Sequence, residues 1–146
     1  MAYGAHLAGK AINISKTTAP HAILYPLTSF FDIPHGHAVG LTLSTFLVFN
    51  ANVTEKDVLD GRGVKYVKET INEICGLLGA KTVWEAKEKI DALFKKIDLK
   101  MQLSSLGLQK KDIELIIANS FNVDRAKNNP RRLTKDALRK IIEEIL

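Results

Sequence analysis

The residues of this sequence best suited to chemistry are its histidines, and all four lie within the first 37 of 146 residues. Three of them fall in one stretch, as His21 and then His35 and His37 on either side of Gly36. Neutral imidazole is the commonest protein ligand for transition metals. We therefore identify His21 and His35 as candidate metal ligands. Their spacing alone leaves a second interpretation open, in which each is a core histidine hydrogen-bonded to a backbone carbonyl.

Two helices have to bring these histidines together. A helix capped by Thr17 or Thr18 is expected to run to about Phe31. Because the residue before a proline avoids the α conformation, this helix should stop ahead of Pro34. A second, apolar helix is expected over residues 35–49. The two imidazoles can meet only if the chain reverses between the helices.

Helical patterns continue to the end of the chain, and the predicted fold class is all-α, a bundle of about six to seven helices. No segment shows the alternation of period two that a strand needs. Thr82 and Glu85 have the spacing of a capping box, and Thr134 is expected to cap the last helix. Further helices are expected over residues 2–15 and 61–78, from Thr82, and over residues 109–120 and 134–146. An irregular segment is expected over residues 122–132.

Several side chains of the second half are expected in the core. Cys75 lies on the apolar face of its helix, and Trp84 is expected to pack at a helix start. The spacing of the helix that follows Thr82 predicts four inward side chains, namely Ala86, Ile90, Leu93 and Phe94.

The composition is that of a globular protein, with 46% hydrophobic and 25% charged residues. The formal net charge is +5, but basic and acidic residues alternate, as in Lys87-Glu88-Lys89. This pattern is typical of solvated helix faces rather than of a nucleic-acid interface. No apolar run is long enough to cross a membrane, and no signal-peptide pattern is present. The single cysteine excludes an internal disulfide. We predict a cytoplasmic protein without nucleic-acid or membrane partners.

Charge is distributed very unevenly along the chain. Residues 1–53 contain only three charged side chains, Lys10, Lys16 and Asp32. A segment with so few charges is expected to be buried, either within the domain or against a partner. The partner could be a further domain or a second copy of the chain.

Three short segments in this region resemble the iron-containing (group III) alcohol dehydrogenases. The most specific feature is a pair of histidines with thirteen residues between them, the second in a Pro-His-Gly sequence. Leu106-Gly107-Leu108 and Asn128-Asn129-Pro130-Arg131 also resemble late segments of the family. The three resembling segments are Ala8-Gly9-Lys10-Ala11-Ile12, Thr17-Thr18-Ala19-Pro20-His21-Ala22 and Ile33-Pro34-His35-Gly36-His37-Ala38.

The resemblance implies that residues 1–146 are a single all-α domain, the C-terminal part of a two-domain enzyme whose nucleotide-binding domain is absent. In the family, Fe²⁺, or in some members Zn²⁺, is held by one Asp and three His. The last two of these histidines correspond to His21 and His35. The metal polarises an alcohol or aldehyde oxygen while hydride is exchanged with NAD or NADP. Because the other two ligands lie upstream of the matched segment, the chain alone is expected to be inactive.

The resemblance also implies a substrate pocket that contains Thr18, Tyr25 and His37. Tyr25 stands where many members have a further histidine. Lys16 and the threonines that follow it are similar to the branch that contains phosphonoacetaldehyde reductases, so the small alcohol or aldehyde substrate could carry a phosphonate. The threonines could equally serve only as helix caps.

A different class of function also fits the pattern. The chain could be a non-catalytic helical interaction module, or a dimerisation domain that has lost the metal site. In that case the histidines should lie apart, and the apolar N-terminal region should be buried in a homodimer.

Overall fold

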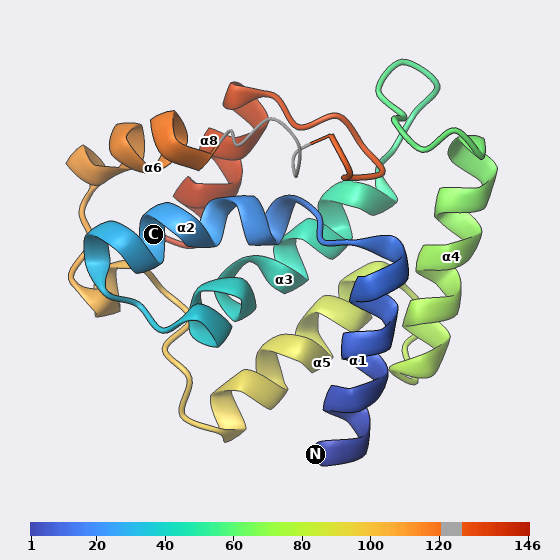
Figure 1. The fold of residues 1–146 in the computed structure, drawn as a ribbon, viewed down its shortest axis with the longest axis horizontal. Helices are drawn as coiled ribbons and strands as arrows, with labels where there is room; N and C mark the ends of the chain where they lie inside the picture. The colour runs from blue at the N-terminus through green and yellow to red at the C-terminus, as the bar shows by residue number, and fades with distance from the viewer. Residues whose placement is uncertain (121–126) are drawn as a thin grey trace.

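The computed structural model describes residues 1–120 and 127–146, with Leu24 described in its backbone only. It contains no strand in these ranges, which confirms the all-α prediction. Two short 3-10 turns, at Ser104–Leu106 and Lys110–Asp112, precede the helix α6. The α-helices described are α1 (Ala2–Ser15), α2 (Ala19–Phe31), α3 (His35–Ala51), α4 (Gly63–Leu77), α5 (Val83–Lys96), α6 (Ile113–Ser120) and α8 (Lys135–Glu144) (Figure 1).

The main core forms where α2 packs between α3 and α6, with α8 covering α3 and α6. The helix α2 brings to this core a face in which Ala19, Ile23 and Leu27 are almost completely buried. Its neighbours contribute Leu41, Phe46, Ile116, Leu138 and Ile142. Burying such apolar side chains stabilises the domain by roughly 1.5–3 kcal/mol each. The packing therefore fixes α2 and α3, the helices that carry the candidate ligands.

A second, smaller core lies at the other end of α3. There α4 and α5 pack against the last turns of α3 around Val53, Val67, Ile71 and Ala86. Cys75 is 3% exposed and belongs to this cluster, which confirms its predicted place in the core.

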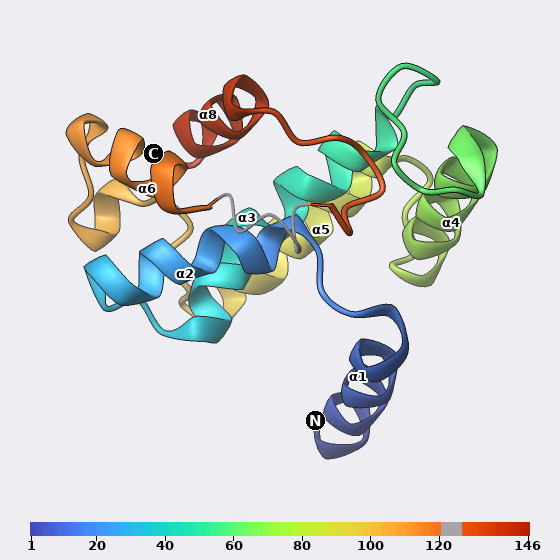
Figure 2. The ribbon, with the colours of Figure 1, turned by 45° about the horizontal axis from the view of Figure 1, so that its top comes forward.

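The helix α1 stands apart from the rest of the chain (Figure 2). None of its fourteen residues is buried, and Tyr3 and Ile14 are 75% and 85% exposed. For α1, burial against a partner stays a prediction, and the expectation that the weakly charged residues 1–53 are buried within the domain is wrong. It is confirmed for α2 and α3, which form the centre of the core.

Helix ends follow the predicted chemistry in part. The hydroxyl oxygen of Thr134 accepts a hydrogen bond from the Ala137 amide, so the predicted cap of the last helix is confirmed. Thr82 likewise caps α5 by accepting from the Glu85 amide. The reciprocal half of the capping box is wrong, because the Glu85 carboxylate accepts from the amide of Lys81.

Two inward predictions for the segment around α5 are wrong. Trp84 is 60% exposed and Leu93 is 56% exposed. The helix lies against α3 through a narrow face, on which Ala86 is completely buried while Ile90 and Phe94 are half-buried. A narrow contact leaves the flanking positions of an apolar stripe in solvent.

The predicted irregular segment at residues 122–132 falls partly outside the described residues. No helix within the described ranges has both the length and the apolar character that a membrane crossing requires.

Candidate metal site and the neighbouring cavity

The starts of α2 and α3 bring His21 and His35 together. Their ring centres lie 5.7 Å apart and the ring planes are inclined by 64°, so the edge of one ring faces the other. His21 is half-buried and His35 is exposed. Two imidazoles that bind one metal ion with bonds of about 2.1 Å have ring centres about 5–6 Å apart. The two rings are therefore spaced suitably for joint coordination.

A tight turn between the helices produces this approach. Asp32 ends α2 in the left-handed conformation, with φ 53°, and the Ile33 amide donates back to the Leu27 carbonyl. Pro34 then occupies the N-cap position of α3, so that His35 is the first residue of the new helix. The chain therefore reverses within three residues, as the spacing of the histidines required.

The donor set fits part of a metal-binding site. In the chain as described, no group of three or more His, Cys, Asp or Glu side chains is placed to hold a metal ion. Two neutral imidazoles suit several divalent transition metals but hold ferrous iron weakly when no carboxylate joins them. His21 and His35 can thus supply two ligands, and a complete coordination sphere needs others.

The three predicted pocket residues lie in different places. Tyr25 is four residues after His21, on the same face of α2, and is 40% exposed. Thr18 occupies the N-cap position of α2, but the predicted side-chain capping bond is not formed. His37 is half-buried on α3, and its Nε2 donates to the carbonyl of Lys100 over 2.6 Å. Its bonding partner is therefore a backbone carbonyl beyond α5.

Gly36 has no steric reason to be glycine among the described residues. A Cβ placed on it would meet no atom within 4 Å.

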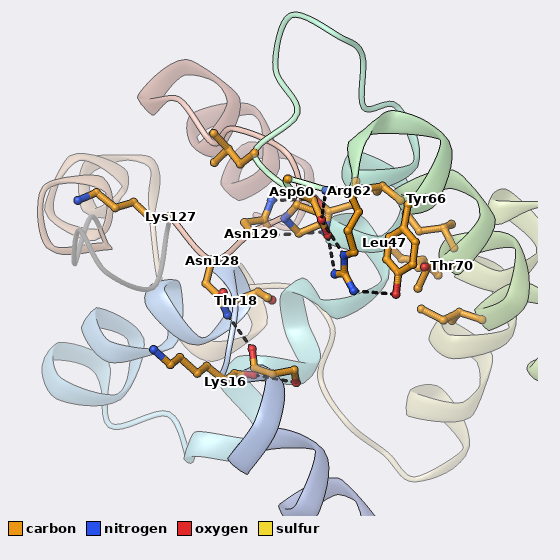
Figure 3. A pocket seen from close by; sticks show the side chains of 18 residues that line it. Lys16, Thr18, Leu47, Asp60, Arg62, Tyr66, Thr70, Lys127, Asn128 and Asn129 are labelled. Atoms are coloured by element: carbon orange, nitrogen blue, oxygen red, sulfur yellow. Dashed lines mark hydrogen bonds and ion pairs between the residues drawn. The ribbon is translucent and has the colours of Figure 1, made fainter.

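A cavity of about 540 Å³ lies next to the start of α2 (Figure 3). Neither His21 nor His35 lines it, but Thr18, one turn before His21, does. Lys16 and Lys127 also line it, and their side chains extend to the same side in Figure 3. In Figure 3 both ammonium groups extend away from the other labelled lining residues, so the lysines place positive charge at the outer rim of the cavity.

The opposite wall of the cavity is internally neutralised. Arg62 binds Asp60 through two hydrogen bonds of 2.9 and 2.7 Å, and donates to the Tyr66 hydroxyl at 2.8 Å. These bonds from Arg62 lower the pKa of Asp60, although its partial burial acts in the opposite direction. The Arg62 guanidinium is thus bonded to Asp60 and Tyr66, and the other positive charges that line the cavity are those of Lys16 and Lys127.

A second cavity, of about 480 Å³, is also polar but neutralised. The Ser44 hydroxyl donates to Asp91 at 2.6 Å, and the Lys87 ammonium lies 3.2 Å from Asp91 and 3.6 Å from Glu144. This network joins α3, α5 and α8, so its role is structural.

The segment after residue 127 ties the site together in a way that residue spacing did not predict. The Asn128 amide donates to the carbonyls of Ser15 and Thr17, at 2.9 and 3.0 Å. Asn129, 1% exposed, exchanges two hydrogen bonds with Asn50 near the end of α3. The sequence Asn128-Asn129-Pro130-Arg131 resembles a segment of a known family, but nothing in it identifies hydrogen-bond partners more than seventy residues away.

Arg131 anchors the same segment to the body of the domain. Its Nε donates to Asp57 at 2.7 Å, another guanidinium nitrogen donates to the Phe49 carbonyl at 2.8 Å, and the group lies over the Phe49 ring. Burial raises the pKa of Asp57, but the hydrogen bonds from Arg131 and Thr54 outweigh it and hold the pKa below its usual value. Asp57 is therefore ionised and paired at neutral pH.

Comparisons with known proteins place the chain in one family. Residues 1–146 match the profile of the Fe-containing alcohol dehydrogenase family, C-terminal. The chain is 31% identical over 145 residues to phosphonoacetaldehyde reductase of Streptomyces viridochromogenes, a match that covers 96% of the chain and 34% of that protein. It is 27% identical to lactaldehyde reductase of Escherichia coli K12, with 92% and 34% covered. The chain thus spans about a third of the length of these relatives.

Solved structures agree with the sequence comparison. The sulfoacetaldehyde reductase of Bifidobacterium kashiwanohense, solved in complex with NAD+, superimposes with a TM-score of 0.67 at 31% identity. That match covers 89% of this chain and 31% of the other. A 1,3-propanediol oxidoreductase superimposes with a TM-score of 0.71 at 24% identity, over 96% and 35% of the two chains, and supports the fold alone.

Proposed function

Because the chain belongs to the iron-containing alcohol dehydrogenase family and matches its C-terminal part, we propose that it supplies two ligands, His21 and His35, to a catalytic divalent metal. The observation that carries the proposal is the approach of the two rings to 5.7 Å. The proposed reaction is the interconversion of an aldehyde and an alcohol by hydride exchange with NAD or NADP. Fe²⁺ is the proposed metal, with Zn²⁺ as the alternative.

The residues of this chain have a limited set of tasks in that reaction. A bound divalent ion supplies Lewis acidity that polarises the substrate oxygen. His21 and His35 bind it through neutral imidazole nitrogens. Tyr25, on the same helix face as His21, is placed to line the space beside it. We expect the nicotinamide cofactor and the remaining ligands to be held by polypeptide outside this chain, and the chain alone to be inactive.

Metal titration of the chain tests the two ligands. NMR spectra of the histidine rings recorded during addition of Zn²⁺ or Co²⁺ should show His21 and His35 responding together. Replacing either one with alanine should weaken binding by about tenfold or more, because a single imidazole remains. His6→Ala on the exposed α1 is the matched control and should change nothing. Independent responses of His21 and His35 would contradict a shared site.

We further propose that the substrate is a small aldehyde with a strongly acidic group. The support is the pair of lysines, Lys16 and Lys127, on one rim of the cavity beside Thr18. Two relatives at 31% identity are named for phosphonoacetaldehyde and sulfoacetaldehyde, which carry such groups. A compact ammonium group is well suited to bind phosphonate or sulfonate oxygens.

Binding of 2-hydroxyethylphosphonate, the alcohol corresponding to phosphonoacetaldehyde, tests this substrate class. Its addition should shift the amide resonances of Lys16 and Thr18, whereas uncharged 1-propanol should not. The double variant K16A/K127A should lose the response, and K110A/K111A, with the same charge change near α6, should keep it. Equal responses to the two alcohols would contradict an acidic substrate.

A further inference from the structure

The linker between α1 and α2 is held partly from outside, by a residue more than a hundred positions away in the sequence. Lys16 adopts a left-handed φ of 61°, which is uncommon for a residue with a Cβ. Thr18 makes no side-chain cap at the start of α2. Local hydrogen bonds join the Lys16 amide to the Ile12 carbonyl and the Ser15 hydroxyl to the Lys16 carbonyl. The bonds from outside come from Asn128, whose amide donates to the carbonyls of Ser15 and Thr17.

Asn128 can hold the linker because its own segment is fixed. The next residue, Asn129, is 1% exposed and donates to Asn50 at 2.8 Å and to the Arg131 carbonyl at 2.6 Å. Arg131 is bonded in turn to Asp57 and to the Phe49 carbonyl. A continuous set of hydrogen bonds therefore runs from the last turn of α3 to the residues that precede α2.

This set of bonds connects the two helices that carry the candidate ligands. The His21 amide donates to the Thr18 carbonyl at 3.0 Å, so His21 lies in the first turn after the linker. Asn129 and Arg131 are attached to the last turn of α3, the helix that His35 begins at its other end. Ala19, in the first turn of α2, is buried in the core, and Asn128 adds hydrogen bonds to the linker that precedes this turn.

We propose that Asn128 is a positioning residue, which holds the linker before α2 and thereby keeps the His21 ring in register with the His35 ring. The part of this inference that concerns metal binding rests on the proposed function. It assigns to Asn128 no contact with metal or substrate.

The variant Asn128→Asp tests it, because the shape is kept while a carboxylate without donors faces two carbonyl oxygens. Asn119→Asp is the matched control, since Asn119 is also exposed and donates to one backbone carbonyl, that of Leu115 on α6. N128D should lose the cross-peaks between the His21 and His35 ring protons and should speed exchange of the His21 amide about tenfold. Its Zn²⁺ affinity should fall by about tenfold, a typical loss when the support of a ligand is removed. N119D should behave like the wild type, and N128S, which keeps one donor, should lie between.

The ring cross-peaks and amide exchange decide the inference even if the proposed function fails. If the wild-type chain binds no Zn²⁺, the metal site is refuted, while the two NMR measurements still report on Asn128. Wild-type cross-peaks and exchange in N128D would overturn the positioning role. The positioning role would also be overturned if the wild-type chain binds Zn²⁺ and N128D loses the ring cross-peaks and the amide protection but keeps the wild-type Zn²⁺ affinity.

Discussion

At the scale of single residues, His21 and His35 behave differently from His37. His21 and His35 face each other because each stands near the first turn of its helix and a three-residue turn joins the two helices. His37 is only two positions from His35, but a helix turns by about 200° over two residues. Its ring consequently bonds the Lys100 carbonyl, away from the pair.

This difference predicts separate effects for the histidines. His37→Ala should leave Zn²⁺ affinity unchanged and reduce the free energy of unfolding by about 1 kcal/mol, the net value of one hydrogen bond. Urea denaturation and the ring titration described above measure the two quantities. A weaker metal affinity with unchanged stability would instead place His37 at the metal.

The ion pair between Asp57 and Arg131 should make stability depend on pH. Asp57 has a lowered pKa in the folded state, so its contribution is present above the usual pKa of 3.8 and is lost as the pH falls through the folded value. Asp57→Asn should therefore lower the free energy of unfolding at pH 7 by about 1–3 kcal/mol, the range for a hydrogen bond to a charged group.

Denaturation of D57N and the wild type from pH 7 to pH 3 measures this effect. The difference between them should begin to shrink below about pH 4, where Asp57 of the unfolded wild type binds a proton, and should vanish once the folded carboxyl is protonated as well. Glu55→Gln, in the same turn, is the control. A difference that stays constant over the range would show that the ion pair does not contribute.

The residue scale also shows what the sequence could and could not reveal about the site. The histidine pair was predictable, because its motif is local and its two helices have clear start and stop residues. The hydrogen bonding of Asn128 and Asn129 was not predictable, because only their resemblance to a family segment marked them. Their hydrogen bonds join positions 79 to 113 residues apart, and no periodicity or cap rule reports such distances.

At the scale of helices, side-chain caps provide local stability that can be measured. Thr134→Ala removes the bond to the Ala137 amide and should lower the free energy of unfolding by about 1 kcal/mol. Thr134→Ser keeps the accepting oxygen and should be nearly neutral. Thermal denaturation of both variants checks this, and equal melting temperatures for T134A and T134S would contradict a role for the hydroxyl.

Helix positions were predicted better than helix faces. The observed bounds of α2 and α4 lie within about two residues of those expected, since proline and glycine set them. Trp84 was expected to pack at a helix start and is exposed. Leu93 was assigned to the core because apolar spacing marks a stripe without showing how wide its contact is. That width depends on the neighbouring helix, here α3, and so on tertiary packing.

At the scale of the whole molecule, α1 differs from every other helix described. This helix of fourteen residues has no buried side chain, and its hydrogen bond to the rest of the chain is the one from Asn128 at its last residue, Ser15. Helices held so little by packing are marginal in water. In this chain, the amides of α1 should exchange with solvent within about tenfold of unstructured rates. Those of α3 should be protected to the limit of global unfolding.

Hydrogen-exchange mass spectrometry at several protein concentrations measures this directly. Protection of α1 that rises with concentration would show that a second copy covers it, as the dimerisation hypothesis requires. Concentration-independent protection equal to that of α3 would contradict the exposed position of α1.

The bonds from Asn128 back to residues 15 and 17 also bear on how the chain is made. The ribosome completes α2 and α3 before α6, which packs on α2, before Asn128, which bonds the residues that precede α2, and before α8, which packs on α3. At about 5–20 residues per second, that delay is on the order of ten seconds. Throughout it, a weakly charged nascent segment is without its neighbours, so we expect it to depend on chaperones. His21 and His35 are thus synthesised well before the residues that fix their final positions.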